Sequence, residues 1–340
     1  MPPYLSTPAA TLKLLLDLIE DGQSADPQIV GITAAMPSGT GLSALEKAMP
    51  DRYFDVGIAE GHGVLFAAGM ATMGYRPVCA IYSTFLQRAY DMIIHDVALQ
   101  NLPVTFCMDR AGLSANDGPT HHGLFDIAYL SCVPGIIAMA PGDEDELADM
   151  MFTATHQNQP TFIRYPRGSG EGVAVKEQPA LIEIGKAEVR QNFSNSGKPK
   201  VAFFALGPMR GIADKAIEEL GAENIDAAII NPRFTKPIDG GTTEFFAQAA
   251  DVIVTIEDHV IKGGYGSIVR DHLGDCGITT PVVRIGWPDQ FIEHASSVGY
   301  LREKHGLTGA NTAEQIRQAL GQASEASARP NPALGQAVGG

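Results

Sequence analysis

Short apolar runs alternate with amphipathic segments along most of the chain. The runs "IVGITA" (29–34), "LPVTFCMD" (102–109) and "DVIVTIED" (251–258) are almost continuously apolar. Segments with helical spacing, such as "GDEDELADMMFTATH" (142–156), lie between them. Strands without polar alternation are typical of a parallel sheet that is covered on both faces. The pattern therefore predicts an α/β fold.

The clearest elements can be placed by residue number. A helix with Thr7 as its cap is expected over 7–22, because the apolar positions recur at helical spacing and Gly22 ends the segment. Further strands are expected at 76–83, 135–141, 161–166, 200–207, 225–232 and 281–286. Further helices are expected at 85–101, 242–250 and 263–273, with another ending at Gly221.

Two units follow from this order. We expect two doubly wound α/β domains, at residues 1–170 and 183–320, joined by a linker at 171–182. Residues 321–340 are rich in Ala, Gly, Pro and Ser and are expected to form a disordered tail.

Composition limits the class of partner. The 340 residues carry 24 basic and 39 acidic side chains, a net charge of −15, which argues against nucleic acid and anionic membranes. The chain shows no signal-peptide pattern and no apolar run of the ~18–20 residues that a membrane span needs, so we expect a cytoplasmic protein. The four cysteines, Cys79, Cys107, Cys132 and Cys276, form no C-x-x-C pair and are interpreted as reduced core residues.

Three polar motifs are better explained by structure than by metal or nucleotide chemistry. In "PGDEDEL", Asp143 and Glu146 have capping-box spacing. Adjacent His121 and His122 are poorly placed to chelate one ion, and we expect the chain to ligate no metal. The "GGYGS" motif (263–267) resembles only half of a dinucleotide fingerprint.

A different set of polar residues lies at the carboxyl ends of strands in the first unit, where open α/β sheets bind ligands. Tyr82 follows one strand, Arg110 the next, and Arg164 and Arg167 lie around the end of a third. The loop "DRAGLSANDGPTHHG" (109–123) adds further carboxylate and imidazole groups. Arginines suit phosphates or carboxylates and histidines move protons near neutral pH, so this edge predicts a pocket for a small anionic substrate with acid–base chemistry.

Longer motifs resemble one family. "DRYFDVGIAE", "GYRPVCAIYSTFLQRAYDMIIHDVALQNLPV", "DRAGLSANDGPTHHG", "YPRG", "PRFTKPID", "GGYGS" and "FIEH" are similar to 1-deoxy-D-xylulose-5-phosphate synthases, thiamine-diphosphate-dependent members of the transketolase superfamily. The resemblance covers about residues 5–310. It implies a pyrimidine-binding domain followed by a transketolase C-terminal domain that serves packing and dimerisation.

The resemblance also implies roles for single residues. Glu60 matches the glutamate that hydrogen-bonds the cofactor's aminopyrimidine, and Phe85 the aromatic residue that packs on this ring. Arg88 is a further candidate for the cofactor site, where it would support the residues that touch the cofactor; the alternative is that it lies on a solvated helix face. Tyr82, Arg110 and Arg167 match residues that hold the anionic ends of substrates. His121 and Asp117 match polar groups beside the reacting carbon, where His121 is expected to transfer a proton.

The sequence departs from the family at two places. The chain has no G-D-G motif for the diphosphate and Mg²⁺, so we expect these on a missing domain or a separate partner chain, in a homodimer or heterotetramer. The family usually reads I-A-E-Q-H-A where this chain has Gly61 and Gly63 around His62. Each glycine costs a helix roughly 1 kcal/mol relative to alanine.

Three hypotheses follow. The first is one subunit of a two-chain synthase that condenses pyruvate, with loss of CO2, onto glyceraldehyde 3-phosphate. The second is a split transketolase-like subunit that acts on another ketose or keto acid. The third is a non-catalytic paralogue that dimerises with or regulates a complete synthase.

Overall fold

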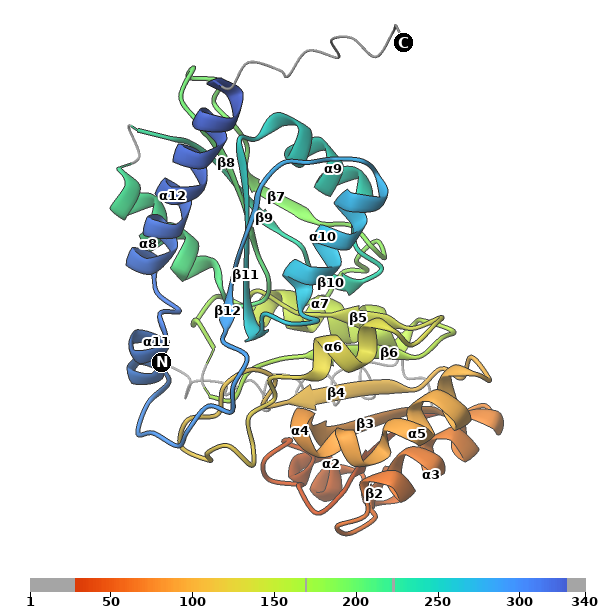
Figure 1. Ribbon diagram of the computed structural model, residues 1–340. Helices are drawn as coiled ribbons and strands as arrows, with labels where there is room; N and C mark the ends of the chain where they lie inside the picture. The colour runs from red at the N-terminus through yellow and green to blue at the C-terminus, as the bar shows by residue number, and fades with distance from the viewer. Residues whose placement is uncertain (1–27, 169, 222–223, 329–340) are drawn as a thin grey trace, which may run out of the picture.

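The computed structural model describes residues 28–168, 170–221 and 224–328, and of 323–328 the backbone alone. The chain forms two sheets, each flanked by helices, which lie one above the other in Figure 1. This confirms the predicted pair of α/β domains. The helix expected at 7–22 lies outside the described residues. Within the described part of the chain, no helix is both long and apolar enough to cross a membrane.

The first sheet has the strand order β10-β5-β6-β4-β3-β1-β2. Its parallel strands are β1 (Ile29–Thr33), β2 (Tyr53–Asp55), β3 (Arg76–Tyr82), β4 (Thr105–Asp109), β5 (Ile137–Met139) and β6 (Thr161–Arg164). The helices between them are α2 (Ser43–Ala48), α3 (Glu60–Thr72), α4 (Ser83–Leu86), α5 (Tyr90–Met92), α6 (Asp126–Ser131) and α7 (Glu144–Thr155), with a 3-10 turn at Pro50–Arg52. The carboxyl ends of β3 and β4 therefore meet, with Tyr82 paired to Asp109.

The second sheet has the order β12-β11-β8-β9-β7. It consists of β7 (Glu188–Gln191), β8 (Lys200–Ala205), β9 (Asp226–Asn231), β11 (Val252–Val260) and β12 (Val282–Trp287), with β7 antiparallel to β9. Its helices are α8 (Arg210–Leu220), α9 (Gly240–Ala249), α10 (Tyr265–Asp275), α11 (Val298–His305) and α12 (Gly309–Ala328). The tail predicted from residue 321 is thus helical as far as Ala328.

The two units share a sheet edge, which the sequence pattern does not predict. Strand β10 (Phe234–Lys236) belongs to the second unit by sequence but pairs antiparallel with β5 of the first sheet. Phe234 is fully buried and packs in the core of the first unit. No helix or strand is described between β6 and β7, and part of the linker is held to α7, where Lys176 pairs with Asp145 and Asp149.

The long helix predicted at 85–101 is broken into segments of different winding. A 3-10 turn (Gln87–Ala89) separates α4 from α5, and a π-helical stretch follows at Ile93–Ala98. Its wide turns are visible in hydrogen bonds from Leu99 N to Ile94 O and from Leu102 N to Val97 O. π-Helical insertions are frequent at functional sites, and this one lies on the helix that carries Arg88.

Two sequence interpretations need correction. Cys79 and Cys107 are buried as expected, but Cys132 and Cys276 are exposed, and all four are free thiols.

Arg164 is not free to bind a substrate anion. It is 7% exposed and donates through Nε to Asp126 Oδ2 (2.7 Å) and through Nη2 to Asp258 O (3.1 Å), so it ties the first unit to β11.

The capping prediction for α7 is confirmed, and the "GGYGS" motif has a related explanation. Asp143 Oδ1 accepts from Glu146 N at 2.9 Å.

At the start of α10, the buried carboxylate of Glu257 accepts from Tyr265 N (2.6 Å) and Gly266 N (2.9 Å). The protein's own carboxylate thus occupies the anion position of this helix N-terminus, which explains the half-fingerprint.

Candidate functional site

Glu60 is the first residue of α3 and is buried, with 4% of its surface exposed. Asp55 sets the entry of the chain into this helix, since its Oδ1 accepts from Ala35 N (2.7 Å) and Gly57 N (2.9 Å). Gly57 has φ +71°, a conformation that glycine adopts without strain. Arg88 Nη1 donates to Glu60 Oε1 at 2.9 Å. Among the described residues, no hydrogen bond is formed by Oε2.

An aromatic group lies next to this ion pair. The Arg88 guanidinium carbon is 5.3 Å from the centre of the Phe85 ring. Phe85 stacks with Tyr82 (centroids 5.7 Å apart) and meets His121 edge-on at 5.1 Å. Tyr82 ends β3 and Phe85 lies in the first turn of α4, so the strand-to-helix turn brings both rings to the carboxyl edge of the sheet.

Two arginines and an aspartate extend the group along the same edge. The Arg110 guanidinium lies 3.7 Å from the centre of the Tyr82 ring. Asp117 Oδ2 accepts from Arg110 Nε at 3.2 Å and pairs with Arg167 Nε at 3.1 Å. Arg110 has φ +60°, a left-handed conformation that a non-glycine residue adopts only at a cost and often at functional sites.

All eight predicted site residues therefore belong to one continuous line of contacts. It runs from Glu60 through Arg88, Phe85, Tyr82 with His121, Arg110 and Asp117 to Arg167. A carboxylate lies at one end, an arginine at the other, and aromatic rings between them. Such a row can orient a flat ring at one end and an anion at the other, with an imidazole between. The roles of the residues stay predictions.

Asp109 is a candidate that the sequence reasoning placed at a strand end but did not select. Its side chain is fully buried, and burial raises its pKa from 3.8 to about 7, although the ion pair with Arg110 Nη1 (2.8 Å) opposes the shift. Its Oδ2 is buried and has no hydrogen-bond partner among the described residues. Burial also raises the pKa of the neighbouring Tyr82 phenol. A carboxyl group that titrates near neutral pH is a candidate proton carrier.

The two adjacent histidines face different surroundings. His121 is partly exposed and contacts the aromatic rings, with Nδ1 2.9 Å from Thr120 Oγ1. His122 is buried, its Nδ1 accepts from Ser114 N (3.2 Å), and its Nε2 lies 3.4 Å from Glu293 O. Burial lowers the pKa of His122. His122 thus holds the 109–123 loop against the second unit, and His121 is the histidine available for chemistry.

Gly61 and Gly63 have different surroundings on α3. A Cβ atom at Gly61 would lie 3.2 Å from the flexible end of Met92, whereas one at Gly63 would lie 3.3 Å from Val56 Cγ2 and within contact of Ile32 and Ile81. Gly63 therefore permits close packing of the helix on the sheet, and Gly61 does not have this function.

Two family models match the chain. The transketolase pyrimidine-binding domain matches residues 8–171, and the transketolase C-terminal domain matches residues 188–311. The first match includes β1 to β6 of the first sheet, and the second includes all strands of the second sheet together with β10.

Curated relatives of high identity are 1-deoxy-D-xylulose-5-phosphate synthases. That of Methylacidiphilum infernorum is 60% identical over 292 residues, which are 86% of this chain and 45% of the relative. That of Acidobacterium capsulatum is 53% identical over 302 residues, which are 89% of this chain and 47% of the relative. The chain thus spans about half the length of the curated relatives it matches.

Solved structures give the same fold. A chain described as a split gene transketolase, inactive beta4 tetramer, superposes with a TM-score of 0.79 at 28% identity and is covered to 99%, against 94% of this chain. A transketolase from Pichia stipitis in complex with sedoheptulose-7-phosphate gives a TM-score of 0.70 over 95% of this chain and 47% of that one; at 16% identity it supports the fold alone. The chain therefore consists of the pyrimidine-binding and C-terminal domains of the transketolase family, to which it belongs, and resembles 1-deoxy-D-xylulose-5-phosphate synthase across both.

Proposed function

We propose that this chain is one half of a thiamine-diphosphate-dependent 1-deoxy-D-xylulose-5-phosphate synthase and works with a separate chain that carries the diphosphate and Mg²⁺ site. The reaction joins pyruvate to glyceraldehyde 3-phosphate and releases CO2. The observation that carries the proposal is the continuous line of contacts from Glu60 to Arg167. Identities of 53% and 60% to the synthases favour this reaction over other transketolase chemistry.

The residues at the Glu60 end fit the pyrimidine half of the cofactor. Glu60 is a buried carboxylate, and one of its oxygens accepts no hydrogen bond among the described residues. This oxygen can accept a hydrogen bond from a protonated ring nitrogen. Phe85 offers an aromatic surface close by, and Arg88 contacts both Glu60 and the Phe85 ring. When bound, the cofactor supplies a nucleophilic carbon and an electron sink.

The other end of the line fits the substrates. Arg110 and Arg167 converge on Asp117 and can instead bind a carboxylate or phosphate by charge-assisted hydrogen bonds. Tyr82 packs against Arg110 and fixes the plane of its guanidinium. His121, which lies against the Phe85 and Tyr82 rings, is the group proposed to move a proton.

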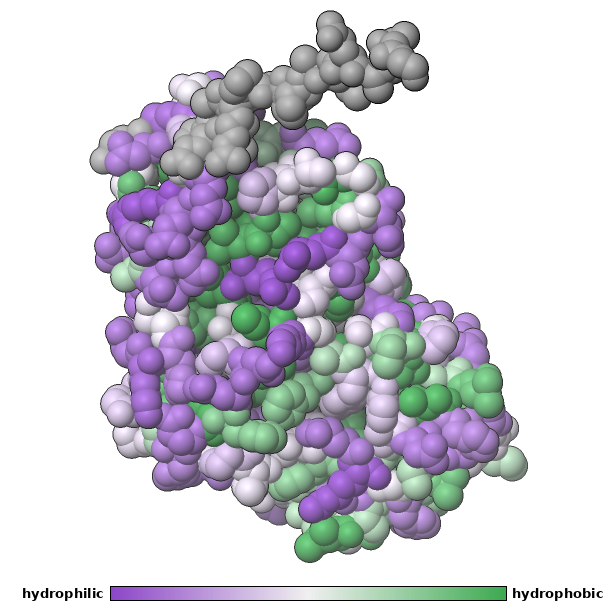
Figure 2. All heavy atoms as spheres, in the orientation of Figure 1, coloured by the Kyte–Doolittle hydropathy of each residue, from purple (hydrophilic) through white to green (hydrophobic). Residues whose placement is uncertain are grey.

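Three observations support a separate partner chain. This chain spans 45–47% of the synthases it matches, and a structural neighbour that it covers to 99% is described as a split gene transketolase. A third observation is an exposed apolar side chain close to the site: Ile58 is 81% exposed, only two residues from the buried Glu60. Figure 2 shows apolar surface at the lower end of the molecule, near the loop between β2 and α3, where a partner would complete the site.

The proposal is tested by mixing this chain with a chain that carries the diphosphate-binding domain, thiamine diphosphate and Mg²⁺. We expect 1-deoxy-D-xylulose 5-phosphate to form from pyruvate and glyceraldehyde 3-phosphate in the mixture and in neither chain alone. Turnover with ketose donors but not with pyruvate would favour a split transketolase. No turnover with either, combined with a measurable effect on an intact synthase, would favour a regulatory paralogue.

A further inference from the structure

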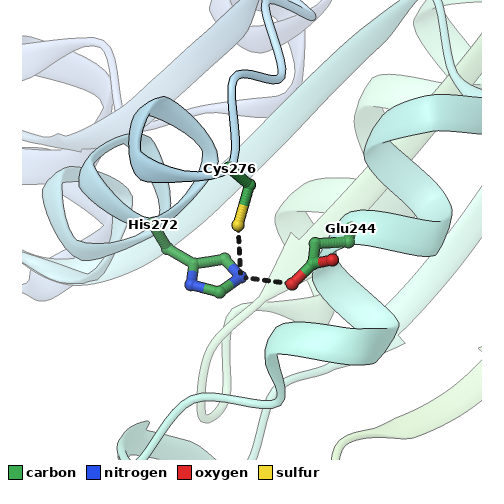
Figure 3. A group of neighbouring side chains, drawn as sticks. All are labelled: Glu244, His272 and Cys276. Atoms are coloured by element: carbon green, nitrogen blue, oxygen red, sulfur yellow. Dashed lines mark hydrogen bonds and ion pairs between the residues drawn. The ribbon is translucent and has the colours of Figure 1, made fainter.

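Three side chains with metal-binding groups meet on the second unit. They belong to helices of the second sheet, whereas the site described above lies at the edge of the first sheet. Figure 3 shows Glu244 on α9 and His272 and Cys276 at the end of α10, all directed toward one point. One oxygen, one nitrogen and one sulfur atom of the three lie within 4.8 Å of one another. Among the residues that the structure describes, this is the group of at least three histidine, cysteine or acidic side chains that meets this spacing.

The backbone holds these side chains in place. His272 and Cys276 are one helical turn apart, and Cys276 N donates to His272 O at 3.1 Å. Phe246 and Leu273, on the inner faces of α9 and α10, are buried in one core cluster, so the two helices are packed together beneath the group. Thr280 Oγ1 also donates to Ala247 O at 2.6 Å, which joins the segment after α10 to α9.

We propose that Glu244, His272 and Cys276 form a Zn²⁺ site with three protein ligands and a fourth position open to water. Thiolate, imidazole and carboxylate together suit zinc, whereas Mg²⁺ and Ca²⁺ prefer sites made of oxygen atoms. The site lies at the surface, with 26% of the His272 side chain and 38% of the Glu244 side chain exposed. The ion therefore has an entry path and room for a water ligand.

The distances are close to those that zinc requires. A tetrahedral ion with bonds of about 2.1 Å to nitrogen and oxygen and about 2.3 Å to sulfur separates N from O by about 3.4 Å and N from S by about 3.6 Å. Here His272 Nε2 lies 3.0 Å from Glu244 Oε1 and 3.9 Å from Cys276 Sγ. These two separations differ from the ideal by about 0.3–0.4 Å, which small side-chain rotations can supply, and all three ligand atoms lie within 4.8 Å of one another.

Gly240 makes room for the central ligand. A Cβ atom at this position would lie 2.9 Å from His272 Cε1 and 3.1 Å from Nε2. Any larger residue would push the imidazole away from its present direction. Gly240 does not have a positive φ, so its backbone conformation does not require glycine. The close approach of His272 explains why a glycine stands at the start of α9.

The first test uses the unaltered chain, free of any histidine tag and stripped of metal. Alkylation of each cysteine by iodoacetamide is followed by mass spectrometry with Zn²⁺ or Mg²⁺ present. We expect Zn²⁺ to slow alkylation of Cys276 and to leave the other exposed thiol, Cys132, unchanged, because metal-bound thiolate is a poor nucleophile. Mg²⁺ should protect neither. Unchanged alkylation of Cys276 at Zn²⁺ concentrations that saturate the chain would overturn the proposal.

The second test measures Zn²⁺ binding by calorimetry. We expect one ion per chain and at least about tenfold weaker binding in His272→Ala and Cys276→Ser, since losing even an outer partner of a metal ligand costs about that much. Cys132→Ser is the matched control and should bind like the unaltered chain. Binding by His272→Ala equal to that of the control would overturn the proposal. A circular dichroism spectrum of each variant shows that it is folded.

Discussion

Arg88 covers Glu60: their Nη1 and Oε1 atoms are 2.9 Å apart, while 59% of the Arg88 side chain and only 4% of the Glu60 side chain are exposed. The buried carboxylate therefore has its hydrogen bond supplied by a side chain that solvent can reach. The guanidinium carbon of Arg88 also lies 5.3 Å from the centre of the Phe85 ring.

Arg88→Ala should destabilise the isolated chain by about 1 kcal/mol, because it leaves a buried carboxylate oxygen without its donor, while solvent screens part of the loss. Urea unfolding of the two proteins measures the difference. Arg210→Ala is a suitable control, since Arg210 pairs with Asp214 where both side chains are exposed and should change stability much less. Equal effects of the two substitutions would mean that Arg88 does not stabilise Glu60.

Gly61→Ala should stabilise α3 more than Gly63→Ala does. Replacing a helical glycine by alanine gains up to about 1 kcal/mol. At Gly61 the closest contact of the new methyl group is the flexible end of Met92, and Arg88 O lies at an ordinary 3.7 Å, but at Gly63 the methyl group meets Val56 at 3.3 Å in the core, where overpacking offsets the gain. Urea unfolding of both variants tests the order. A larger gain at Gly63 would show that the helix can move away from the sheet without cost.

His121→Ala and His122→Ala should separate chemistry from folding. In the two-chain assay, His121→Ala should lower turnover by roughly a hundredfold or more, the usual contribution of a general acid or base, with the unfolding midpoint little changed. His122→Ala should lower the midpoint, because His122 joins Ser114 to Glu293 across the two units. The account is wrong if the two substitutions exchange these effects.

Asp109 should make folding stability fall as the pH rises toward neutrality. Its pKa is about 7 in the folded chain and near the ordinary 3.8 when unfolded, so between these values the folded state holds a proton that the unfolded state lacks. The stability that this proton contributes is present at low pH and is lost as the pH rises to about 7, at up to about 1.4 kcal/mol per pH unit.

Asp109→Asn isolates this effect because asparagine does not titrate. The unfolding free energy of the unaltered chain minus that of the variant should fall between about pH 5 and 7 and level off above about pH 8. Taking the difference removes the opposite contribution of buried histidines such as His259, whose pKa burial lowers. A difference that does not change with pH would contradict the raised pKa of Asp109.

Local patterns predict the α/β alternation and the strand ends, and the resemblance adds the roles of the site residues. Period and length mark the longer parallel strands but not the three-residue β2, and polar residues at the ends of β3 and β4 mark the edge where Tyr82 and Arg110 lie. What sequence patterns miss depends on long-range packing. β10 pairs with a strand almost a hundred residues away, and nothing in "PRFTKPID" indicates that partner.

The same limit applies to single side chains. Arg164 and Arg167 are three residues apart, yet Arg164 is buried against Asp126 and Arg167 faces Asp117 at the site. His272 and Cys276 are four residues apart in sequence, but Glu244 joins them only once α9 packs on α10. Tertiary contacts decide which of two similar residues faces solvent, and local pattern does not contain them.

We propose that Glu60 holds the cofactor in a site completed by a second chain. The most direct measurement compares pyruvate and glyceraldehyde 3-phosphate turnover by the mixed chains carrying Glu60 or Glu60→Gln, a substitution of nearly equal shape. The account predicts turnover in the first mixture and a loss of roughly a hundredfold or more in the second, with the same unfolding midpoint for both chains. Equal turnover by the two mixtures, or full turnover by this chain without a partner, would contradict it.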